Sequence, residues 1–71
     1  MAARVYRFKI GTMPATSFQV RKQSMSQLRL GGRVFVREPS DGSKWQQVVI
    51  DKIDEDPAHD PHQNLYFAYK L

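Results

Sequence analysis

The chain has no cysteine among its 71 residues. This absence excludes disulfide bonds, a thiol nucleophile and zinc sites built on cysteine ligands. It also agrees with a reducing compartment, and we therefore expect a cytoplasmic protein. No apolar run approaches the roughly 18 residues that a membrane-spanning helix needs. The N-terminus also lacks the apolar stretch of a signal peptide, so we expect no association with a membrane.

Acidic residues are missing from the first half of the chain. Residues 1–37 carry eight lysines and arginines and no aspartate or glutamate, whereas residues 38–71 carry three basic and seven acidic residues. The two halves therefore have formal charges of +8 and −4, which give the net charge of +4. Such asymmetry indicates an anionic partner. The alternative is that the two halves interleave in the fold and that their charges pair.

The composition that remains is that of one folded domain. Hydrophobic residues make up 41% of the chain and charged residues 25%, values typical of globular rather than disordered proteins. A chain of 71 residues has no room for a second core, so we assign residues 1–71 to a single domain. Such a chain buries only about 60% of the surface that its unfolded form exposes, so its stability margin is small.

Three segments of the basic half alternate between apolar and polar residues, as half-buried strands do. They are Val5 to Ile10, Ser17 to Lys22 and Arg33 to Arg37. Gly11 to Pro14 separates the first two, because glycine loosens the backbone and proline cannot donate to a β-ladder. We expect the first two strands to pair antiparallel. The predicted inward side chains are Tyr6, Phe8, Ile10, Phe18, Val20, Val34 and Val36.

A short helical turn is expected between the second and third strands. Ser24 to Gln27 has the form of a capping box, in which the serine hydroxyl and the glutamine amide satisfy each other's backbone donors. Leu28 and Leu30 follow, and Gly31-Gly32 is a typical end for a helix. The turn is too short to be stable without tertiary packing.

The second half begins with a predicted turn over residues 39–43, where proline, serine, aspartate and glycine gather. The stretch that follows is ambiguous. Val48 to Ile50 is a run of three β-branched residues and favours a strand over residues 44–53. Helical spacing is also present, so the alternative is an α+β fold with a helix at 44–54. The residues with that spacing are Trp45, Val48, Val49 and Ile53.

Residues 54–63 form an acidic segment with two prolines, which we expect to be an exposed and mobile loop. His59 and His62 offer imidazoles beside its carboxylates, but the run matches no established ligand spacing, so we predict no metal. The last predicted strand runs from Leu65 to Leu71, with Leu65, Phe67 and Tyr69 on one face. The predicted core therefore also contains Val48, Ile50, Leu65 and Phe67.

These elements predict a mainly β fold. Five short strands and one helical turn suit a small antiparallel five-stranded barrel of the SH3-like or OB-like kind. The spacing of apolar residues from Arg33 to Leu71 also resembles the strand–turn–strand–loop–strand pattern of SH3-like barrels such as Tudor and chromo modules. This resemblance covers about half of the chain. Because small barrels host many functions, the function must be argued from the surface.

Catalysis is not indicated by the sequence. No serine lies in a nucleophile-elbow sequence, and no glycine-rich loop leads into a helix. The serines are better explained as caps and turn residues, and the chain is short for a substrate cleft. We therefore predict a small basic binding module that needs no cofactor, rather than an enzyme.

A basic face is the strongest indication of function. Outward side chains of the first three strands would combine, if the strands are neighbours, into a grid of cations suited to phosphate. Phe35 lies between Arg33 and Arg37 on that face and could stack on an unpaired base. The alternative for Phe35 is that it packs under the capped turn. The predicted nucleic-acid-binding residues are Arg7, Lys9, Arg21, Arg33, Phe35 and Arg37.

The alternative function is a protein-interaction, inhibitor or accessory module that docks on a larger protein. SH3-like barrels often bind peptides through aromatic residues around a groove. Trp45, Tyr66 and Tyr69 would supply such a groove. Trp45 directly follows the predicted turn, as a partly exposed aromatic residue would, although a core position is the slightly favoured explanation.

Overall fold

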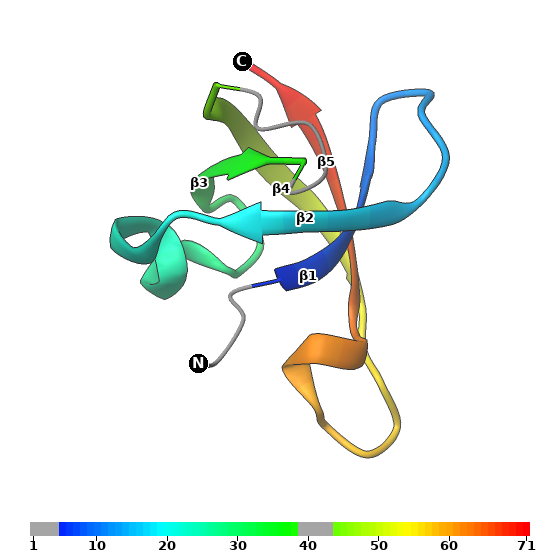
Figure 1. Ribbon diagram of the computed structural model, residues 1–71. Coiled ribbons are helices and arrows are strands. Elements are labelled where there is room, and N and C mark those ends of the chain that lie inside the picture. Colours follow the sequence, from blue (N-terminus) through cyan, green and yellow to red (C-terminus); the bar gives the residue numbers. More distant parts are fainter. Residues whose placement is uncertain (1–4, 39–43) are drawn as a thin grey trace.

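The chain folds into a closed barrel of five short strands with two 3-10 helices between them (Figure 1). The computed structural model describes residues 5–38 and 44–71, so the turn predicted at 39–43 lies outside the described residues. No helix within those two ranges has the length and apolar character needed to cross a membrane. The elements are β1 (Val5–Ile10), β2 (Thr16–Val20), η1 (Lys22–Gln27), β3 (Arg33–Arg37), β4 (Gln46–Asp54), η2 (Pro61–Gln63) and β5 (Leu65–Lys70). The predicted mainly β barrel is confirmed.

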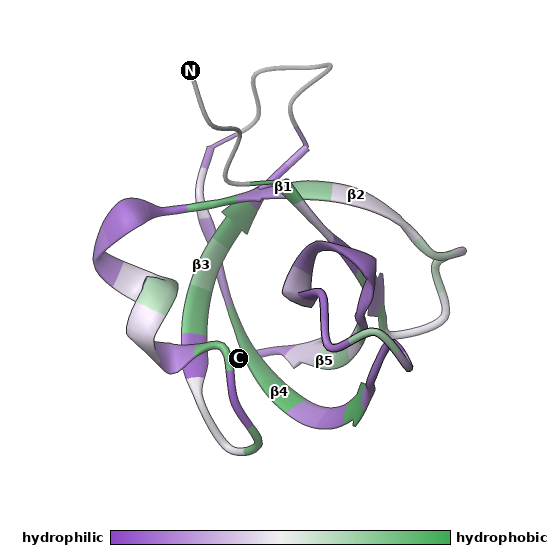
Figure 2. Ribbon diagram, turned by 90° about the horizontal axis from the view of Figure 1, so that it is seen from below, coloured by the Kyte–Doolittle hydropathy of each residue, from purple (hydrophilic) through white to green (hydrophobic). Residues whose placement is uncertain are grey.

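Each strand pairs antiparallel with the next one along the chain, so the order is up-and-down rather than Greek-key. Direction alternates from strand to strand, and with five strands the first and the last run the same way. The ring therefore closes through a parallel pairing of β1 with β5. Figure 2 shows this ring from below, with the segment that carries η2, which lies at the lower end of the molecule in Figure 1, nearest the viewer. The five strands consequently share one interior.

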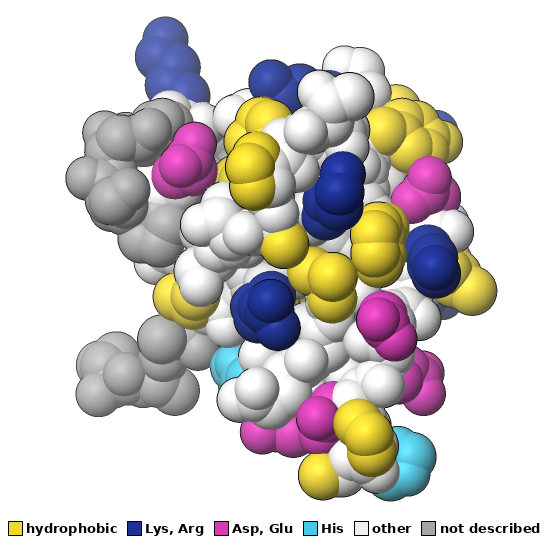
Figure 3. All heavy atoms as spheres, turned by 90° about the vertical axis from the view of Figure 1, so that its right-hand side faces the viewer, with side chains coloured by type: hydrophobic (Ala, Val, Ile, Leu, Met, Phe, Trp, Pro, Cys, Tyr) yellow, Lys and Arg dark blue, Asp and Glu magenta, His cyan; other side chains and the backbone are white. Residues whose placement is uncertain are grey.

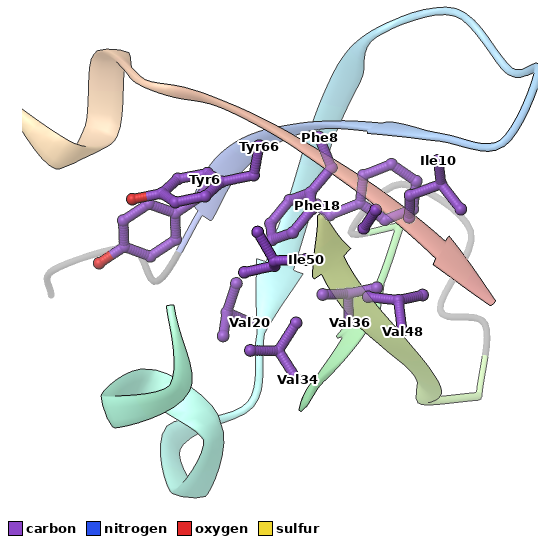
Figure 4. Close-up of a cluster of buried hydrophobic side chains, with 11 residues drawn as sticks. Tyr6, Phe8, Ile10, Phe18, Val20, Val34, Val36, Val48, Ile50 and Tyr66 are labelled. Atoms are coloured by element: carbon purple, nitrogen blue, oxygen red, sulfur yellow. The ribbon is translucent and has the colours of Figure 1, made fainter. Parts of the chain in front are cut away.

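That interior is filled by side chains that alternate inward from all five strands (Figure 4). The Phe8 ring is fully buried and lies edge-on to Phe18 and stacked on Tyr66, with centroids 6.0 and 5.3 Å apart. The inward residues predicted for the first four strands are all confirmed. The buried core consists of Tyr6, Phe8, Ile10, Phe18, Val20, Val34, Val36, Val48, Ile50, Tyr66 and Ala68.

The predicted inward face of β5 is wrong by one residue. Tyr66 and Ala68 are buried, whereas Leu65 and Phe67 are half-buried on the outer face and Tyr69 is exposed. The register explains the difference, because residues that face each other across a ladder share one side of the sheet. Tyr66 lies opposite Phe8, and Ala68 lies between Ile10 on β1 and Ile50 on β4. A slip of one residue would turn all of these side chains over.

The segment at 44–53, for which the sequence allowed a strand or a helix, forms strand β4 from Gln46 on. A bulge in this strand explains the helix-like spacing of its apolar residues. The β4–β5 register shifts between Ile50 and Lys52, which marks a β-bulge at Asp51. A bulge inserts one unpaired residue and so resets the alternation of the strand. Ile50 and Ile53 therefore both face the core, three residues apart, although no helix is present at 44–54. The alternative α+β fold is excluded.

The capping box predicted at Ser24–Gln27 is wrong. The 3-10 helix η1 begins earlier, and its N-cap residue Arg21 makes no side-chain cap hydrogen bond. Ser24 is instead buried, and its Oγ accepts a hydrogen bond of 3.1 Å from the backbone N–H of Phe35. The hydroxyl therefore satisfies a donor of β3 rather than one of its own helix, and it ties η1 to that strand.

Residues 54–63 are mostly exposed, as predicted, but they are also held by hydrogen bonds within the loop. Asn64 Oδ1 accepts from the backbone N–H of Asp56 at 2.7 Å, and Asp56 Oδ2 accepts from the N–H of Ala58 at 3.0 Å. Asp60 Oδ1 accepts from the N–H of His62 at 3.0 Å and so caps η2. The mobility of this loop stays a prediction.

His62 connects the loop to β1. Its ring stacks on Tyr6 with centroids 4.5 Å apart and planes inclined by 11°, and its Nδ1 lies 3.1 Å from the carbonyl oxygen of Val5. These contacts anchor the loop at the lower end of the barrel, away from β3. Burial also raises the pKa of the Tyr6 hydroxyl, and the neighbouring Tyr66 adds to the increase by charge repulsion.

Candidate nucleic-acid interface

Two of the predicted residues are in contact on the outer surface of β2 and β3. Arg21 directly follows β2, and its backbone N–H donates to the carbonyl oxygen of Phe35 at 2.9 Å. This bond brings the two side chains side by side, and the guanidinium carbon of Arg21 lies 5.3 Å from the centroid of the Phe35 ring. A cation within about 6 Å of a ring face is attracted by the ring quadrupole. Arg21 is exposed and Phe35 is half-buried.

Arg37 makes a second pair of the same kind. Its Nε donates to Gln19 Oε1 at 2.9 Å, and Gln19 lies directly opposite it on β2. On the β4 side, the guanidinium carbon lies 4.5 Å from the centroid of the half-buried Trp45 ring. Contacts on both sides hold the guanidinium in one orientation. Because arginine has five N–H donors, several remain for a ligand.

The structure therefore merges residues that the sequence assigned to two different functions. Trp45, predicted for a peptide groove, lies beside Arg37, predicted for nucleic acid. Arg33 extends the same outer surface of β3, where it is exposed and lies opposite Val49. The name β3 face is used below for the surface formed by Gln19, Arg21, Arg33, Phe35, Arg37 and Trp45.

The hydrogen bonds of the basic side chains do not involve carboxylates in the described ranges 5–38 and 44–71. Lys9 donates to the carbonyl oxygen of Gly11, Arg29 to Gln27 Oε1, and Arg37 to Gln19 Oε1. Most of the described carboxylates lie instead between residues 51 and 60, on the β4 bulge and in the loop before β5, and Glu38 follows β3. Glu38 therefore borders the β3 face directly after Arg37, and Asp54 lies across Leu65 from Arg7, whereas the other described carboxylates lie on the bulge and in the loop.

Arg7 and Lys9 do not belong to the β3 face. The outer surface of a barrel curves, and β1 lies between β2 and β5. Arg7 lies opposite Ser17 on β2 and Leu65 on β5, and Lys9 lies opposite Phe67. The basic grid predicted for the first three strands requires one flat surface, which a closed ring of five strands does not provide.

A second basic and aromatic cluster, which the sequence analysis missed, lies on the outer surface of β1, β4 and β5. The Nζ of Lys52 lies 5.0 Å from the centroid of the Phe67 ring, and Lys9 lies opposite Phe67 on β1. Figure 3 shows the side of the barrel opposite η1, where basic side chains alternate with apolar ones and acidic side chains gather toward the lower end. The sequence pattern did not reveal this cluster, because strict alternation from Ile50 would turn Lys52 inward, whereas the bulge at Asp51 turns it outward.

The predicted peptide groove is not assembled. Tyr66 is buried, with 2% of its side chain exposed, and its hydroxyl accepts a hydrogen bond of 3.3 Å from Asn64 Nδ2. Tyr69 is 46% exposed and lies opposite Val49, while Trp45 lies beside Arg37. The assignment of Tyr66 to a binding surface is wrong, because β5 turns this residue into the core.

Ser24→Ala is expected to lower the free energy of unfolding by about 1–3 kcal/mol, because the N–H of Phe35 would lose its hydrogen-bond partner in a part-buried position. Ser26→Ala is the matched control. Ser26 lies in the same helix but is exposed, so its replacement should change the stability by less than about 0.5 kcal/mol. Urea denaturation of both variants measures the difference, and equal effects would show that the Ser24 hydroxyl does not support β3.

Titratable groups outside the β3 face gather in the loop before β5. An open pocket of about 230 Å³ lies beside the loop and is lined by Glu55, His59, Pro61 and Asn64. Within residues 5–38 and 44–71, no group of three or more histidines and carboxylates is arranged to hold a metal ion. That the loop binds no metal stays a prediction.

Comparison of the chain with protein-family models, with curated proteins and with solved structures finds no match.

Proposed function

We propose that the protein is a small basic binding module that binds nucleic acid through the β3 face. The observation that supports this most directly is the pair of guanidinium–aromatic contacts, Arg21 with Phe35 and Arg37 with Trp45, on one outer surface. Arginine is well suited to phosphate because its planar fork can donate two parallel hydrogen bonds. Aromatic rings beside such cations offer stacking surfaces to unpaired bases.

Charge supports the same function. Arg21, Arg33 and Arg37 lie on strands, or directly after a strand, within the acid-free first 37 residues. Apart from Glu38, which directly follows Arg37, the described acidic residues lie between residues 51 and 60, which would keep an anionic ligand away from the loop before β5. Attraction of this kind accelerates encounter and falls steeply as salt is added. We propose binding without catalysis, and a cytoplasmic location and an SH3-like relationship stay predictions.

Binding to a single strand is expected to weaken with salt along a slope of about −2 in log affinity against log salt, if the three arginines of the β3 face each neutralise about one phosphate. Replacing Arg33 and Arg37 together with glutamine should flatten the slope toward about −0.7, since each lost phosphate contact removes about 0.7. The variant should stay folded, with a stability loss of about 0.5–1.5 kcal/mol from the hydrogen bond between Arg37 and Gln19, because the exposed Arg33 contributes little to folding. Titration of a labelled oligonucleotide at several salt concentrations measures the slope.

The matched control replaces Arg29 and Lys70 with glutamine. This variant loses the same formal charge, but both residues lie outside the β3 face and are exposed. Its slope should stay close to that of the parent protein. If both double variants flatten the slope equally, net charge and not the β3 face determines binding, and if the parent does not bind at low salt, the proposed function is wrong.

A second candidate is a module that docks on a larger protein, as an inhibitor or accessory subunit. The observation that favours it is the exposure of large apolar side chains on the far side of β4 from β3. Tyr69 is 46% exposed and Leu71 is 63% exposed, and Val49 lies opposite Tyr69. Trp45 and Tyr69 would then be the residues to test first. Tyr69→Ala should weaken such docking without changing the salt dependence of nucleic-acid binding.

A further inference from the structure

We infer that the β3 face binds two successive unpaired bases, one on the Arg21–Phe35 pair and one on the Arg37–Trp45 pair, so that its ligand is a single strand and not a duplex. The inference rests on the proposed function and adds to it a ligand class and a second stacking position. Trp45 is the new element, because no property of the sequence placed it beside the predicted basic residues.

The spacing of the two aromatic residues supports separate bases. Phe35 lies directly opposite Gln47 on β4, and Trp45 comes two residues before Gln47. Residues in this diagonal relation across two strands are roughly 7–8 Å apart at Cα. That distance is about twice the 3.4 Å by which successive nucleotides rise along one strand of a duplex. If the two rings keep the spacing of their Cα atoms, neighbouring bases on them are unstacked from each other, which a single strand allows and a duplex does not.

In each of the two stacking positions, the arginine contributes a planar guanidinium group as well as a positive charge. Arg37 is held between Gln19 Oε1 and the Trp45 ring, and Arg21 lies over Phe35. Bases stack on guanidinium planes as well as on aromatic rings in complexes with single-stranded nucleic acid. A lysine at either position would keep the positive charge but would remove the plane. This difference separates stacking from simple attraction to phosphate.

The shape of the barrel also disfavours a duplex. The major groove admits a helix or a projecting two-stranded ribbon. The strands that carry the β3 face are instead flanked on both sides by other strands of the closed ring. The half-buried rings of Phe35 and Trp45 cannot reach base edges at the bottom of a groove, whereas the bases of a single strand can come to them.

The experiment uses the fluorescence of Trp45, which is the only tryptophan of the chain. The full-length protein is titrated with an eight-nucleotide oligothymidylate, with an abasic phosphodiester oligomer of the same length, and with a duplex of the same length. Oligothymidylate should quench Trp45 and bind roughly tenfold or more tightly than the abasic oligomer, because each stacked base contributes to binding. The abasic oligomer and the duplex should bind through phosphate contacts without quenching.

Charge-preserving variants provide the second arm. Arg21→Lys and Arg37→Lys should each bind labelled oligothymidylate several-fold more weakly, while the abasic oligomer and the salt slope stay unchanged. Trp45→Leu and Phe35→Leu should bind it roughly tenfold more weakly, and Tyr69→Leu is the aromatic control outside the face. The two lysine variants replace partly or fully exposed groups, so they keep the test valid if a leucine variant unfolds.

Each remaining outcome overturns the inference in a distinguishable way. Equal affinity for oligothymidylate and the abasic oligomer, or no quenching on binding, would remove both stacking positions and leave phosphate binding in place. Duplex binding as tight as that of the single strand would show that the ligand need not be single-stranded. The absence of binding to all three probes would overturn the inference together with the proposed function.

Discussion

Phe8→Ala is expected to lower the free energy of unfolding by about 3–5 kcal/mol, the range observed when a buried phenylalanine is truncated. Phe8 is 0% exposed, and its ring contacts Phe18 and Tyr66. The loss combines the transfer free energy of the ring with a cavity that strands on every side of a closed barrel cannot easily fill. Small domains have only about 5–15 kcal/mol of stability in total, so the variant should be close to unfolding at 37 °C.

The control is Phe67→Ala, which removes the same atoms from the outer face of the neighbouring strand. Phe67 is half-buried and lies opposite Lys9, with Lys52 over its ring. Its loss should cost about 1 kcal/mol, the typical effect of a single substitution. Urea denaturation of both variants measures the difference. An equal cost for the two would contradict the assignment of inward and outward faces, including the corrected face of β5.

Gly32→Ala is expected to have the second largest effect, a loss of about 3 kcal/mol, at the upper end of the cost of overpacking. A Cβ at Gly32 would overlap the backbone carbonyl of Gln27 and approach the carbonyl oxygen of Arg29 to 3.0 Å. These obstacles are backbone atoms and not flexible side-chain ends, so relief requires movement of the segment after η1. Gly32 also accepts the N–H of Ile50 at 3.0 Å, and this hydrogen bond would move with it.

Gly31→Ala is the comparison for this prediction. Gly31 has a φ of +77°, but no atom lies within 4 Å of the position a Cβ would take. Its replacement should cost only the backbone strain of an L-residue in the left-handed region, about 1–2 kcal/mol. Thermal melting and urea denaturation rank the two variants. A larger loss for Gly31 would mean that backbone conformation, and not the close approach of the chain at Gly32, controls this segment.

Much of the fold could be predicted because alternation is unambiguous where one face of a strand is apolar and the other is charged. In β1, Arg7 and Lys9 separate Tyr6, Phe8 and Ile10, and only one orientation buries the apolar side. In β5, Leu65 to Tyr69 is apolar on both faces, so the pattern contains no information about orientation. Pairing with Phe8 and Ile10 determines that orientation, and such long-range pairing is not visible in a local pattern.

The outward orientation of single residues in the candidate site could be predicted, but which of them lie together on one surface could not. Alternation alone placed Arg21, Phe35 and Arg37 outward, and the structure agrees. The curvature of the ring, which moves Arg7 and Lys9 next to β5, depends on which strands meet when the barrel closes. Trp45 joins Arg37 through the register of β3 and β4, in which Val36 lies opposite Gln46. Register is a property of the assembled sheet and not of either strand alone.

The parallel pairing of β1 with β5 has a consequence for how the chain folds. Arg7 lies opposite Leu65, so hydrogen bonds join segments from the two ends of the chain. Contacts between residues so distant in sequence require a large loss of chain entropy before they form, which places small β proteins of this kind among the slower, millisecond-to-second folders. Until the last strand arrives, β1 and β4 each expose an unpaired edge that can pair with another chain. The interval before closure is therefore the stage of folding at which this protein is most exposed to aggregation.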